Sequence, residues 1–269
     1  MDLSIIIVNW NTSTLLNNCI SSIKEETKNI DYEIIINDNN SSDNSCKIVE
    51  ENHPDVILIK SNVNYGFSKG NNSAVKCAKG EYLLFLNPDT LIKDKAIEKT
   101  FYYIKSLEKK VLVGCKLLNP DGTIQLSSAS FPNIFNIIFA THPKSIKMHN
   151  RNHETDWVMG AFMMINKRVF EGIGCFDDDF FMYSEDLDLC FRLKRNHGRV
   201  FYYADANIIH FYNQSGLKKW NNEREERVRS STNLFFKKNY SFITSMVYSA
   251  LYNLRFILKC FIKKYKRKI

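Results

Sequence analysis

The first 110 residues alternate between short apolar runs and segments with helical periodicity. A β-branched run at Leu3 to Val8 is followed by Thr14 to Ile23, whose apolar residues lie on one helical face. Three further pairs of strand and helix follow, with strands predicted at 33–37, 56–60 and 82–86 and helices at 43–51, 67–78 and 95–107. This order predicts an α/β fold, with a mostly parallel sheet flanked by helices.

Polar residues follow each predicted strand. They are Asn9 to Thr12, Asp38 to Asp43, Asn62 to Gly66 and Asn87 to Asp89. Ligands of a parallel sheet bind beyond the carboxyl ends of its strands, so this edge is the predicted binding site. Each segment taken singly also fits an ordinary turn or helix cap.

The tripeptide Asn-Pro-Asp occurs twice, in two different contexts. The first copy ends the strand predicted at 82–86, and we expect Asp89 to hold a metal ion rather than cap a helix. The second copy continues into Gly122, which is typical of a tight turn. We therefore expect Asp121 to have a structural role.

After residue 110 the regular alternation fades. Residues 111–118 and 123–127 flank the second Asn-Pro-Asp and predict a hairpin. The segment 130–155 has little periodicity and is interpreted as a long mobile loop. Its histidines have no regular ligand spacing, so we expect them to lie in solvent; they are His142, His149 and His153.

The stretch 156–165 is apolar and predicts one buried strand with a glycine in its middle. A glycine inside a strand indicates close approach by a backbone or a ligand. We therefore expect Trp157 and Gly160 to line an acceptor pocket.

A second acidic cluster begins the helix predicted at 185–196, which Ser184 would cap. Its first turn contains Glu185, Asp186 and Asp188. Carboxylates in a first turn often stabilise the helix dipole and have no catalytic role. The aromatic run Phe180 to Tyr183 would place them near a dry pocket, which favours a site.

Two polar features follow this helix. His210 ends the apolar approach 207–210 and is either a second metal ligand or a hydrogen-bonded rim residue, and the residues alone favour the rim. The segment 213–219 has the composition of a flexible flap, from which a lysine could reach a diphosphate.

The C-terminus combines positive charge with an apolar stripe. The net charge of +8 is concentrated in Lys259, Lys263, Lys264, Lys266, Arg267 and Lys268. Apolar residues recur every three or four positions from Ile243 to Ile262, which predicts an amphipathic helix on an anionic membrane surface rather than a contact with nucleic acid. The alternative is a helix docked on the protein's own core. Arg255 and Lys259 argue against a spanning helix.

Several classes of protein are disfavoured. The chain has no G-x-G-x-x-G and no P-loop motif, which argues against dinucleotide oxidoreductases and P-loop enzymes. The apolar run near the N-terminus is too short for a signal peptide, so we expect a cytoplasmic protein. The seven scattered cysteines predict reduced thiols, without zinc or disulfides.

Taken in order, these segments resemble inverting nucleotide-sugar glycosyltransferases of family 2, which have the GT-A fold, and in particular a bacterial rhamnosyltransferase-like branch. The resemblance rests on Ile5 to Asn11, Asp38 to Asp43, Asn64 to Asn72, Phe85 to Asp89 and Phe181 to Leu189, with His210 at the expected distance. It covers residues 3 to about 215. It divides the chain into a catalytic domain, 1–240, and a helical tail, 241–269. Within the domain, 1–110 would bind the nucleotide sugar and 111–240 the acceptor.

The resemblance implies a role for each site residue. Asp38 would contact the donor's base with Asn11 beside it, and Gly66 and Asn71 also belong to the donor side. Asp89 and His210 would hold Mg²⁺ or Mn²⁺ on the diphosphate. Asp186 would deprotonate the acceptor hydroxyl for a single inverting displacement, with Glu185 in the acceptor pocket.

One departure concerns the metal. The family's usual Asp-x-Asp is Asn87-Pro88-Asp89 here, so only one carboxylate is present. We therefore expect the cation to be held weakly, mainly through the donor's phosphates.

Two rival functions stay open. One is a non-catalytic nucleotide-sugar-binding or scaffold protein with the same fold. The other is a nucleotidyltransferase, which would need a glycine-rich, arginine-bearing loop where this chain has Asn9 to Thr12. By branch, the first donor to consider is dTDP-rhamnose. The acceptor expected from the tail is a lipid-linked surface glycan, with the protein on the inner face of the cell membrane.

Overall fold

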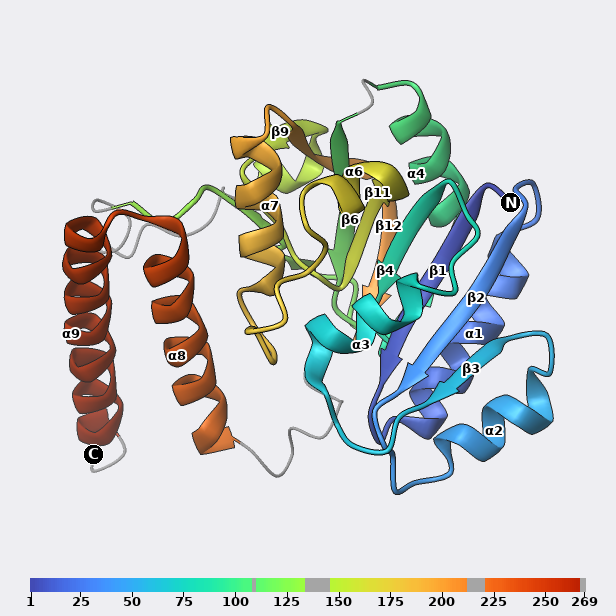
Figure 1. The fold of residues 1–269 in the computed structure, drawn as a ribbon, viewed down its shortest axis with the longest axis horizontal. Coiled ribbons are helices and arrows are strands. Elements are labelled where there is room, and N and C mark those ends of the chain that lie inside the picture. The colour runs from blue at the N-terminus through green and yellow to red at the C-terminus, as the bar shows by residue number, and fades with distance from the viewer. Residues whose placement is uncertain (108–109, 134–145, 212–220, 267–269) are drawn as a thin grey trace.

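A computed structural model describes residues 1–107, 110–133, 146–211 and 221–266 (Figure 1). Its first half alternates strand and helix as predicted. The elements are β1 (Leu3–Asn9), α1 (Ser13–Glu26), β2 (Tyr32–Asp38), α2 (Ser45–Asn52), β3 (Ile57–Lys60), α3 (Gly66–Val75) and β4 (Tyr82–Leu86). Strands β3, β2, β1 and β4 lie side by side and are all parallel. Their carboxyl ends therefore meet at one edge.

The second half extends this sheet beyond β4, and β3 remains the edge strand on the other side. The elements are β5 (Thr90–Ile92), α4 (Ala96–Lys105), β6 (Val111–Leu118), β7 (Ile124–Gln125), β8 (Ser128–Ala129), η1 (Met148–Asn150), β9 (His153–Thr155), β10 (Trp157–Val158), β11 (Phe162–Asn166), α6 (Lys167–Gly172), α7 (Glu185–Arg195), β12 (Arg199–His210), α8 (Asn221–Asn239) and α9 (Phe242–Lys266). The order continues from β4 through β11, β6 and β12 to β5.

Strand β11 is inserted antiparallel between β4 and β6. Its N-terminal end lies beside the carboxyl end of β4, with Phe162 opposite Leu86. Strand β12 is parallel to β6, so His210 reaches the same edge. The insertion brings residues of the second half to the polar edge of the first.

Apolar side chains cover both faces of the sheet. Ile5 and Ile7 of β1 pack with α1 and α4 in one cluster, while Ile6 packs with α3 and α7 in another. This alternation follows from the two-residue period of a strand. Because both faces are covered, the edge with the strand ends is the part left open to a ligand.

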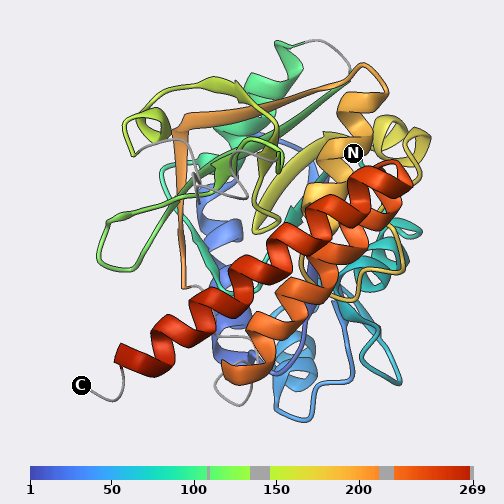
Figure 2. The ribbon, with the colours of Figure 1, turned by 90° about the vertical axis from the view of Figure 1, so that its left-hand side faces the viewer.

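Helices α8 and α9 lie side by side beyond α7, at the end of the molecule far from β3 (Figures 1 and 2). Phe235 and Phe236 of α8 are fully buried against α7 and α9. Helix α9 contributes Tyr248, Leu251 and Tyr252 to this contact. The helix therefore does dock on the protein.

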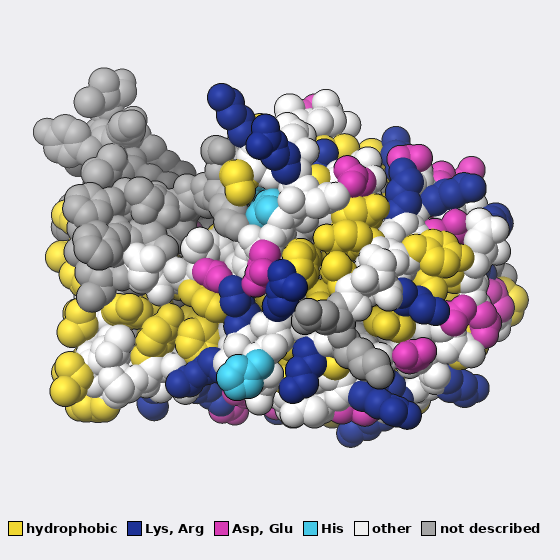
Figure 3. All heavy atoms as spheres, turned by 90° about the horizontal axis from the view of Figure 1, so that it is seen from above, with side chains coloured by type: hydrophobic (Ala, Val, Ile, Leu, Met, Phe, Trp, Pro, Cys, Tyr) yellow, Lys and Arg dark blue, Asp and Glu magenta, His cyan; other side chains and the backbone are white. Residues whose placement is uncertain are grey.

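The apolar stripe expected on α9 is largely exposed where its side chains are described. Ile243, Met246, Val247, Leu254 and Leu258 of the stripe are exposed, and so are the neighbouring Phe242 and Ile257. Figure 3 shows hydrophobic side chains along the edge of the molecule that α9 forms. Of the expected stripe, Leu251 belongs to the docked face instead. No described helix is both apolar enough and long enough to cross a bilayer.

Three expectations need correction. The segment 130–155 is not simply a solvated loop, because β9 pairs with β12 and His149 is fully buried. The Nε2 atom of His149 accepts hydrogen bonds of 3.2 Å from the backbone N–H groups of Ser127 and Ser128. His142 and the flap expected at 213–219 lie outside the described residues.

The other two corrections concern backbone geometry near the pocket. The stretch 156–165 forms two strands, because β10 pairs with β8 and β11 joins the main sheet. Ser184 precedes α7 but makes no side-chain cap, since its φ of 64° is left-handed. In contrast, the predicted turn is present: Asp121 Oδ1 accepts a 2.9 Å hydrogen bond from the Thr123 N–H.

Candidate active site

Asp89 and His210 meet at the open edge of the sheet. Residue 89 is followed by β5 rather than by a helix, so Asp89 is not a helix cap. Pairing of β5 with β12 puts Thr90 opposite His210. Asp89 Oδ1 then lies 3.3 Å from His210 Nε2, with both side chains only 3% exposed.

Gln125 orients the His210 imidazole. Its amide nitrogen donates to the His210 backbone carbonyl at 2.7 Å and to Asn119 Oδ1 at 2.8 Å. Its Oε1 is therefore the acceptor for His210 Nδ1, at 2.9 Å. With the proton on Nδ1, the lone pair of Nε2 faces Asp89, which is the arrangement that a histidine ligand needs.

Asp89 and His210 fit a cation that would enter the site already bound to the phosphates of a substrate. Among the described residues, no three His, Cys, Asp or Glu side chains gather into a metal-binding group. One carboxylate oxygen and one imidazole nitrogen would leave most of the shell of Mg²⁺ or Mn²⁺ to phosphate oxygens and water.

Asp186 occupies the first turn of α7. Tyr183 and Ser184 both have positive φ, 72° and 64°, and this unusual backbone precedes the helix. The carboxylate of Asp186 accepts hydrogen bonds from the backbone N–H of Gly160 at 2.9 Å and of Leu187 at 2.7 Å. Burial raises the pKa of Asp186, and these two N–H donors oppose the rise. The carboxylate is therefore held in a fixed direction.

The neighbouring acids have different surroundings. Burial, followed by repulsion from Asp186, raises the pKa of Glu185 well above its usual value. Glu185 Oε2 is buried without a hydrogen-bond partner in the described part of the chain. Asp188 accepts hydrogen bonds of 2.7 Å from Arg192 Nε and Asn239 Nδ2, so it ties α7 to the end of α8. Of the three acids, only Glu185 and Asp186 line the pocket.

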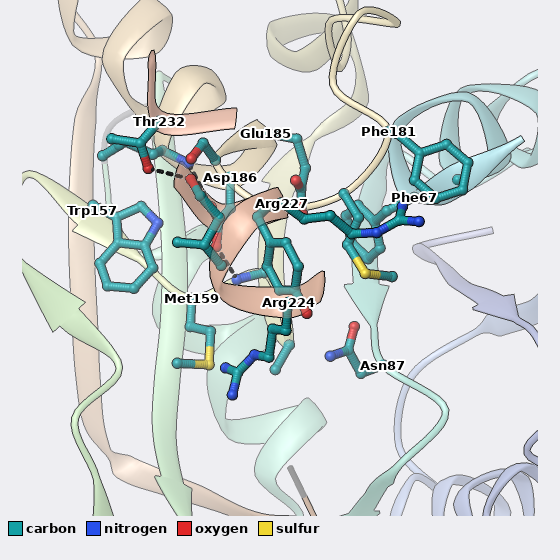
Figure 4. Close-up of a pocket in the computed structure, with 18 of the residues that line it drawn as sticks. Phe67, Asn87, Trp157, Met159, Phe181, Glu185, Asp186, Arg224, Arg227 and Thr232 are labelled. Atoms are coloured by element: carbon teal, nitrogen blue, oxygen red, sulfur yellow. Dashed lines mark hydrogen bonds between the residues drawn. The ribbon is translucent and has the colours of Figure 1, made fainter. Parts of the chain in front are cut away.

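One pocket of about 680 Å³ brings these groups together. Its lining includes Asp89, His210, Glu185 and Asp186. Trp157 and Gly160, which the sequence predicts for the acceptor side, also line it. The volume suits a ligand of several rings. Figure 4 shows Trp157, Asp186 and Glu185 around the cavity, with Asn87 beside it.

The donor-side residues predicted from the sequence separate into two groups. Gly66 lines the pocket, with φ of 79°. Asn71 is buried and donates to the Phe67 carbonyl within α3, and it does not line the pocket. Asp38 is also buried, and its carboxylate accepts hydrogen bonds from Asn9 and Ser41.

Asn11 joins the loops that follow β1 and β2. Its side-chain oxygen accepts a 2.7 Å hydrogen bond from the backbone N–H of Ser42. In place of Asn11 and Asp38, the neighbouring Asn9, Trp10 and Asn39 reach the pocket wall.

Sequence reasoning missed the contribution of the C-terminal helices. Arg224 and Arg227 of α8 and Arg255 of α9 line the pocket. The spacing of three between the first two is a signal that could have been found, because such residues share one face of a helix.

The mostly parallel sheet with a pocket at its open edge has the architecture of the GT-A fold. The chain belongs to glycosyl transferase family 2, whose family model matches residues 4–174. It is therefore a glycosyltransferase.

Named relatives agree with this assignment. The low-salt glycan biosynthesis hexosyltransferase Agl10 of Haloferax volcanii is 31% identical over 78% of this chain and 67% of its own length. Rhamnosyltransferase WbbL of Escherichia coli is 27% identical over 80% of this chain and 88% of its own length.

A solved structure shows the same fold. The mannosyltransferase PcManGT of Pyrobaculum calidifontis, in complex with GDP-Man and Mn²⁺, superposes with a TM-score of 0.62 over 88% of this chain and 63% of that chain. The two sequences are 17% identical, so this likeness concerns the fold alone.

Proposed function

We propose that this glycosyltransferase moves a sugar from a nucleoside diphosphate to a hydroxyl of a glycan with inversion, and that Asp186 is the catalytic base. The observation that carries this proposal is the shared pocket of Asp186, Asp89 and His210. A buried carboxylate fixed by two backbone N–H groups suits proton abstraction from an alcohol.

The reaction is a single displacement. The acceptor oxygen gives its proton to Asp186 and forms a bond to the anomeric carbon, while the bond from that carbon to the phosphate oxygen breaks. The nucleoside diphosphate leaves with the electron pair. Bound at Asp89 and His210, Mg²⁺ or Mn²⁺ would neutralise charge on that diphosphate. The N–H groups of Gly160 and Leu187 would keep the base aimed at the acceptor.

The donor's nucleoside would bind where β1 and β2 end. Asp38 accepts a hydrogen bond from Asn9 at the end of β1, and Asn11 accepts one from Ser42 after β2, so both residues hold these strand ends together. We assign Asp38 and Asn11 to donor binding as residues that shape the nucleoside site, and Gly66 as a residue that lines it. Asn71 would support α3. The likeness to WbbL supports rhamnose, and dTDP-rhamnose is the first donor to test.

The acceptor proposed is a lipid-linked surface glycan, with the protein bound to the inner face of the cell membrane. The exposed apolar face of α9 supports this, because a helix of this kind buries its apolar side at the lipid boundary. The lysines between positions 259 and 268 of the sequence would meet anionic headgroups. In this view residues 241–269 form a membrane-facing tail on a catalytic domain of 1–240.

The decisive experiment measures release of nucleoside diphosphate. Purified protein with Mg²⁺ or Mn²⁺ is given a panel of nucleotide sugars, with and without extracts of lipid-linked glycan. Release from one donor, lost on chelation and in Asp186→Asn, would support the proposal and identify the sugar. Binding of a donor without release of nucleoside diphosphate, whichever acceptor extract is added, would instead favour a non-catalytic binding protein.

A further inference from the structure

Three arginines from the C-terminal helices line the pocket. Arg224 and Arg227 lie one turn apart on α8, and Arg255 comes from α9. Each is partly buried. Figure 4 shows the side chains of Arg224 and Arg227 directed into the cavity that Asp186 and Glu185 also line. The pocket therefore has a positively charged wall that the strand ends do not provide.

Two of these guanidinium groups lie over aromatic rings of the segment that precedes α7. The guanidinium carbon of Arg224 lies 5.9 Å from the centroid of the Tyr183 ring. That of Arg227 lies 5.6 Å from the Phe181 ring centroid. Both rings belong to the segment that leads directly into Glu185 and Asp186. Stacking on an aromatic face orients a guanidinium, and arginine binds planar or tetrahedral anions through its N–H edges.

Two other arginines serve for comparison. Arg192 donates to Asp188 and to the backbone carbonyls of Ile173 and Cys175. Arg199 pairs with Glu154 on the surface. Neither lines the pocket. The arginines of the pocket wall differ because they face the space where substrates bind.

The ligand that suits such a wall is a phosphate group. Arginine binds phosphate oxygens through parallel N–H donors, and several arginines together match the charge of a diphosphate. Two substrates of a glycosyltransferase could carry one: the nucleotide donor, or an acceptor linked to a lipid through a diphosphate. The two substrates would offer the arginines the same phosphate oxygens, so the location of the arginines in the pocket must decide between donor and acceptor.

Position favours the acceptor. The arginines belong to the α8–α9 hairpin, whereas the Asp89–His210 pair proposed for the donor's diphosphate lies at the strand ends. On α9, Arg255 is adjacent to the exposed Leu254 and one turn from the exposed Leu258. A lipid diphosphate needs cations beside an apolar surface, and this hairpin has both.

We propose that Arg224, Arg227 and Arg255 bind the diphosphate of a lipid-linked acceptor. The proposal rests on the function given above and specifies its acceptor as a glycan joined to lipid through a diphosphate. The arginines are positioning residues: they hold the acceptor's phosphates so that its hydroxyl reaches Asp186.

Binding measurements test this without turnover. Farnesyl diphosphate serves as the probe for a lipid diphosphate, and calorimetry with EDTA present excludes metal-dependent binding. We expect wild type to bind it, and Arg224→Ala and Arg227→Ala each to weaken binding by about 10- to 100-fold, the range for a charged hydrogen-bond partner. Arg227→Lys keeps the charge and should restore part of the affinity.

Two controls separate the possible sources of the phosphate. Lys237→Ala removes a positive charge from an exposed position of α8 outside the pocket and should leave binding of farnesyl diphosphate unchanged. Binding of dTDP with Mg²⁺ should be the same in wild type and in both alanine variants.

Farnesyl diphosphate affinity equal to that of wild type in both correctly folded alanine variants would overturn the proposal. So would weakened dTDP binding with unchanged farnesyl diphosphate binding, which would assign the arginines to the donor. An inactive enzyme that still binds the probe through these arginines would contradict the proposed function but not this site.

Discussion

The backbone N–H of Gly160 donates a 2.9 Å hydrogen bond to Asp186 Oδ2, joining the break between β10 and β11 to the first turn of α7. A continuous strand would place the Gly160 N–H in the sheet ladder. Because the strand is interrupted there, this N–H can orient the carboxylate instead. A Cβ added at Gly160 would lie 3.4 Å from the Asp186 Cβ, at ordinary contact distance, so the backbone N–H rather than the missing side chain links Gly160 to Asp186.

Asp186→Asn should lower kcat by about 100- to 10,000-fold, the usual contribution of a general base, with donor affinity largely kept. Steady-state kinetics and calorimetry with the donor would check both. Asp188→Asn is the matched control from the same helical turn. It should lower stability rather than abolish chemistry, since Asp188 is bound to Arg192 and Asn239. Undiminished turnover in Asp186→Asn would exclude Asp186 as the base.

Asp89→Asn should weaken donor binding at least about tenfold when Mn²⁺ is present, because a charged metal ligand is lost. With EDTA, the variant and wild type should bind the donor equally. Asp121→Asn changes the other Asn-Pro-Asp copy, whose carboxylate serves only the turn. It should match wild type in both conditions. If Asp89→Asn also matched wild type with Mn²⁺, the metal role of Asp89 would be rejected.

Glu185 should make the folded state less stable as pH rises. Its pKa is raised well above 4.5, so the folded protein keeps a proton that the unfolded chain has lost. The free energy of unfolding should therefore fall from about pH 5 upward, until the folded carboxyl has also ionised. Glu185→Gln should flatten this dependence and raise the melting temperature at alkaline pH. The free energy of unfolding would be measured by urea titration at each pH. The same pH dependence in wild type and Glu185→Gln would contradict this account.

Gly66→Ala should destabilise the protein more than Gly122→Ala. Both glycines have positive φ, 79° and 82°, so each alanine costs about 1–2 kcal/mol of backbone strain. At Gly66 the new Cβ would also overlap the Phe181 carbonyl oxygen and lie 2.8 Å from its ring carbon Cδ2, whereas nothing lies within 4 Å at Gly122. Overpacking adds about 1–3 kcal/mol. Equal unfolding free energies for the two variants would show that the Phe181 contact adapts freely.

Ile243→Glu combined with Met246→Glu should reduce binding to vesicles of phosphatidylcholine and phosphatidylglycerol at least about tenfold. Each side chain buried at the lipid boundary contributes about 1.5–3 kcal/mol. Both residues are exposed, at 75% and 58%, so the melting temperature should stay the same. Ser230→Glu adds charge at an exposed position of α8 and serves as the control. If the double variant and wild type sedimented with the vesicles to the same extent, α9 would be excluded as the membrane contact.

Much of the fold was predictable because its signals are local. Apolar runs and helical periodicity predicted β1 to β4 and the helices between them, and the parallel arrangement followed from their order. The turn around Asp121 was predicted for the same reason, since Gly122 determines it. The acidic start of α7 and the amphipathic α9 were likewise visible, because each depends on residues close together in the chain.

The sequence by itself determined which segments are strands and helices, and which polar residues end them. The tertiary structure decided which of those residues meet. Pairing of β5 with β12 brings Asp89 to His210, and insertion of β11 brings Gly160 to Asp186. Packing of α8 against α7 adds Arg224 and Arg227, whose spacing of three puts them on one helix face but does not show that this face meets the site. These contacts join residues distant in sequence, so they depend on which buried surfaces pack together, and a single chain read in order does not specify that.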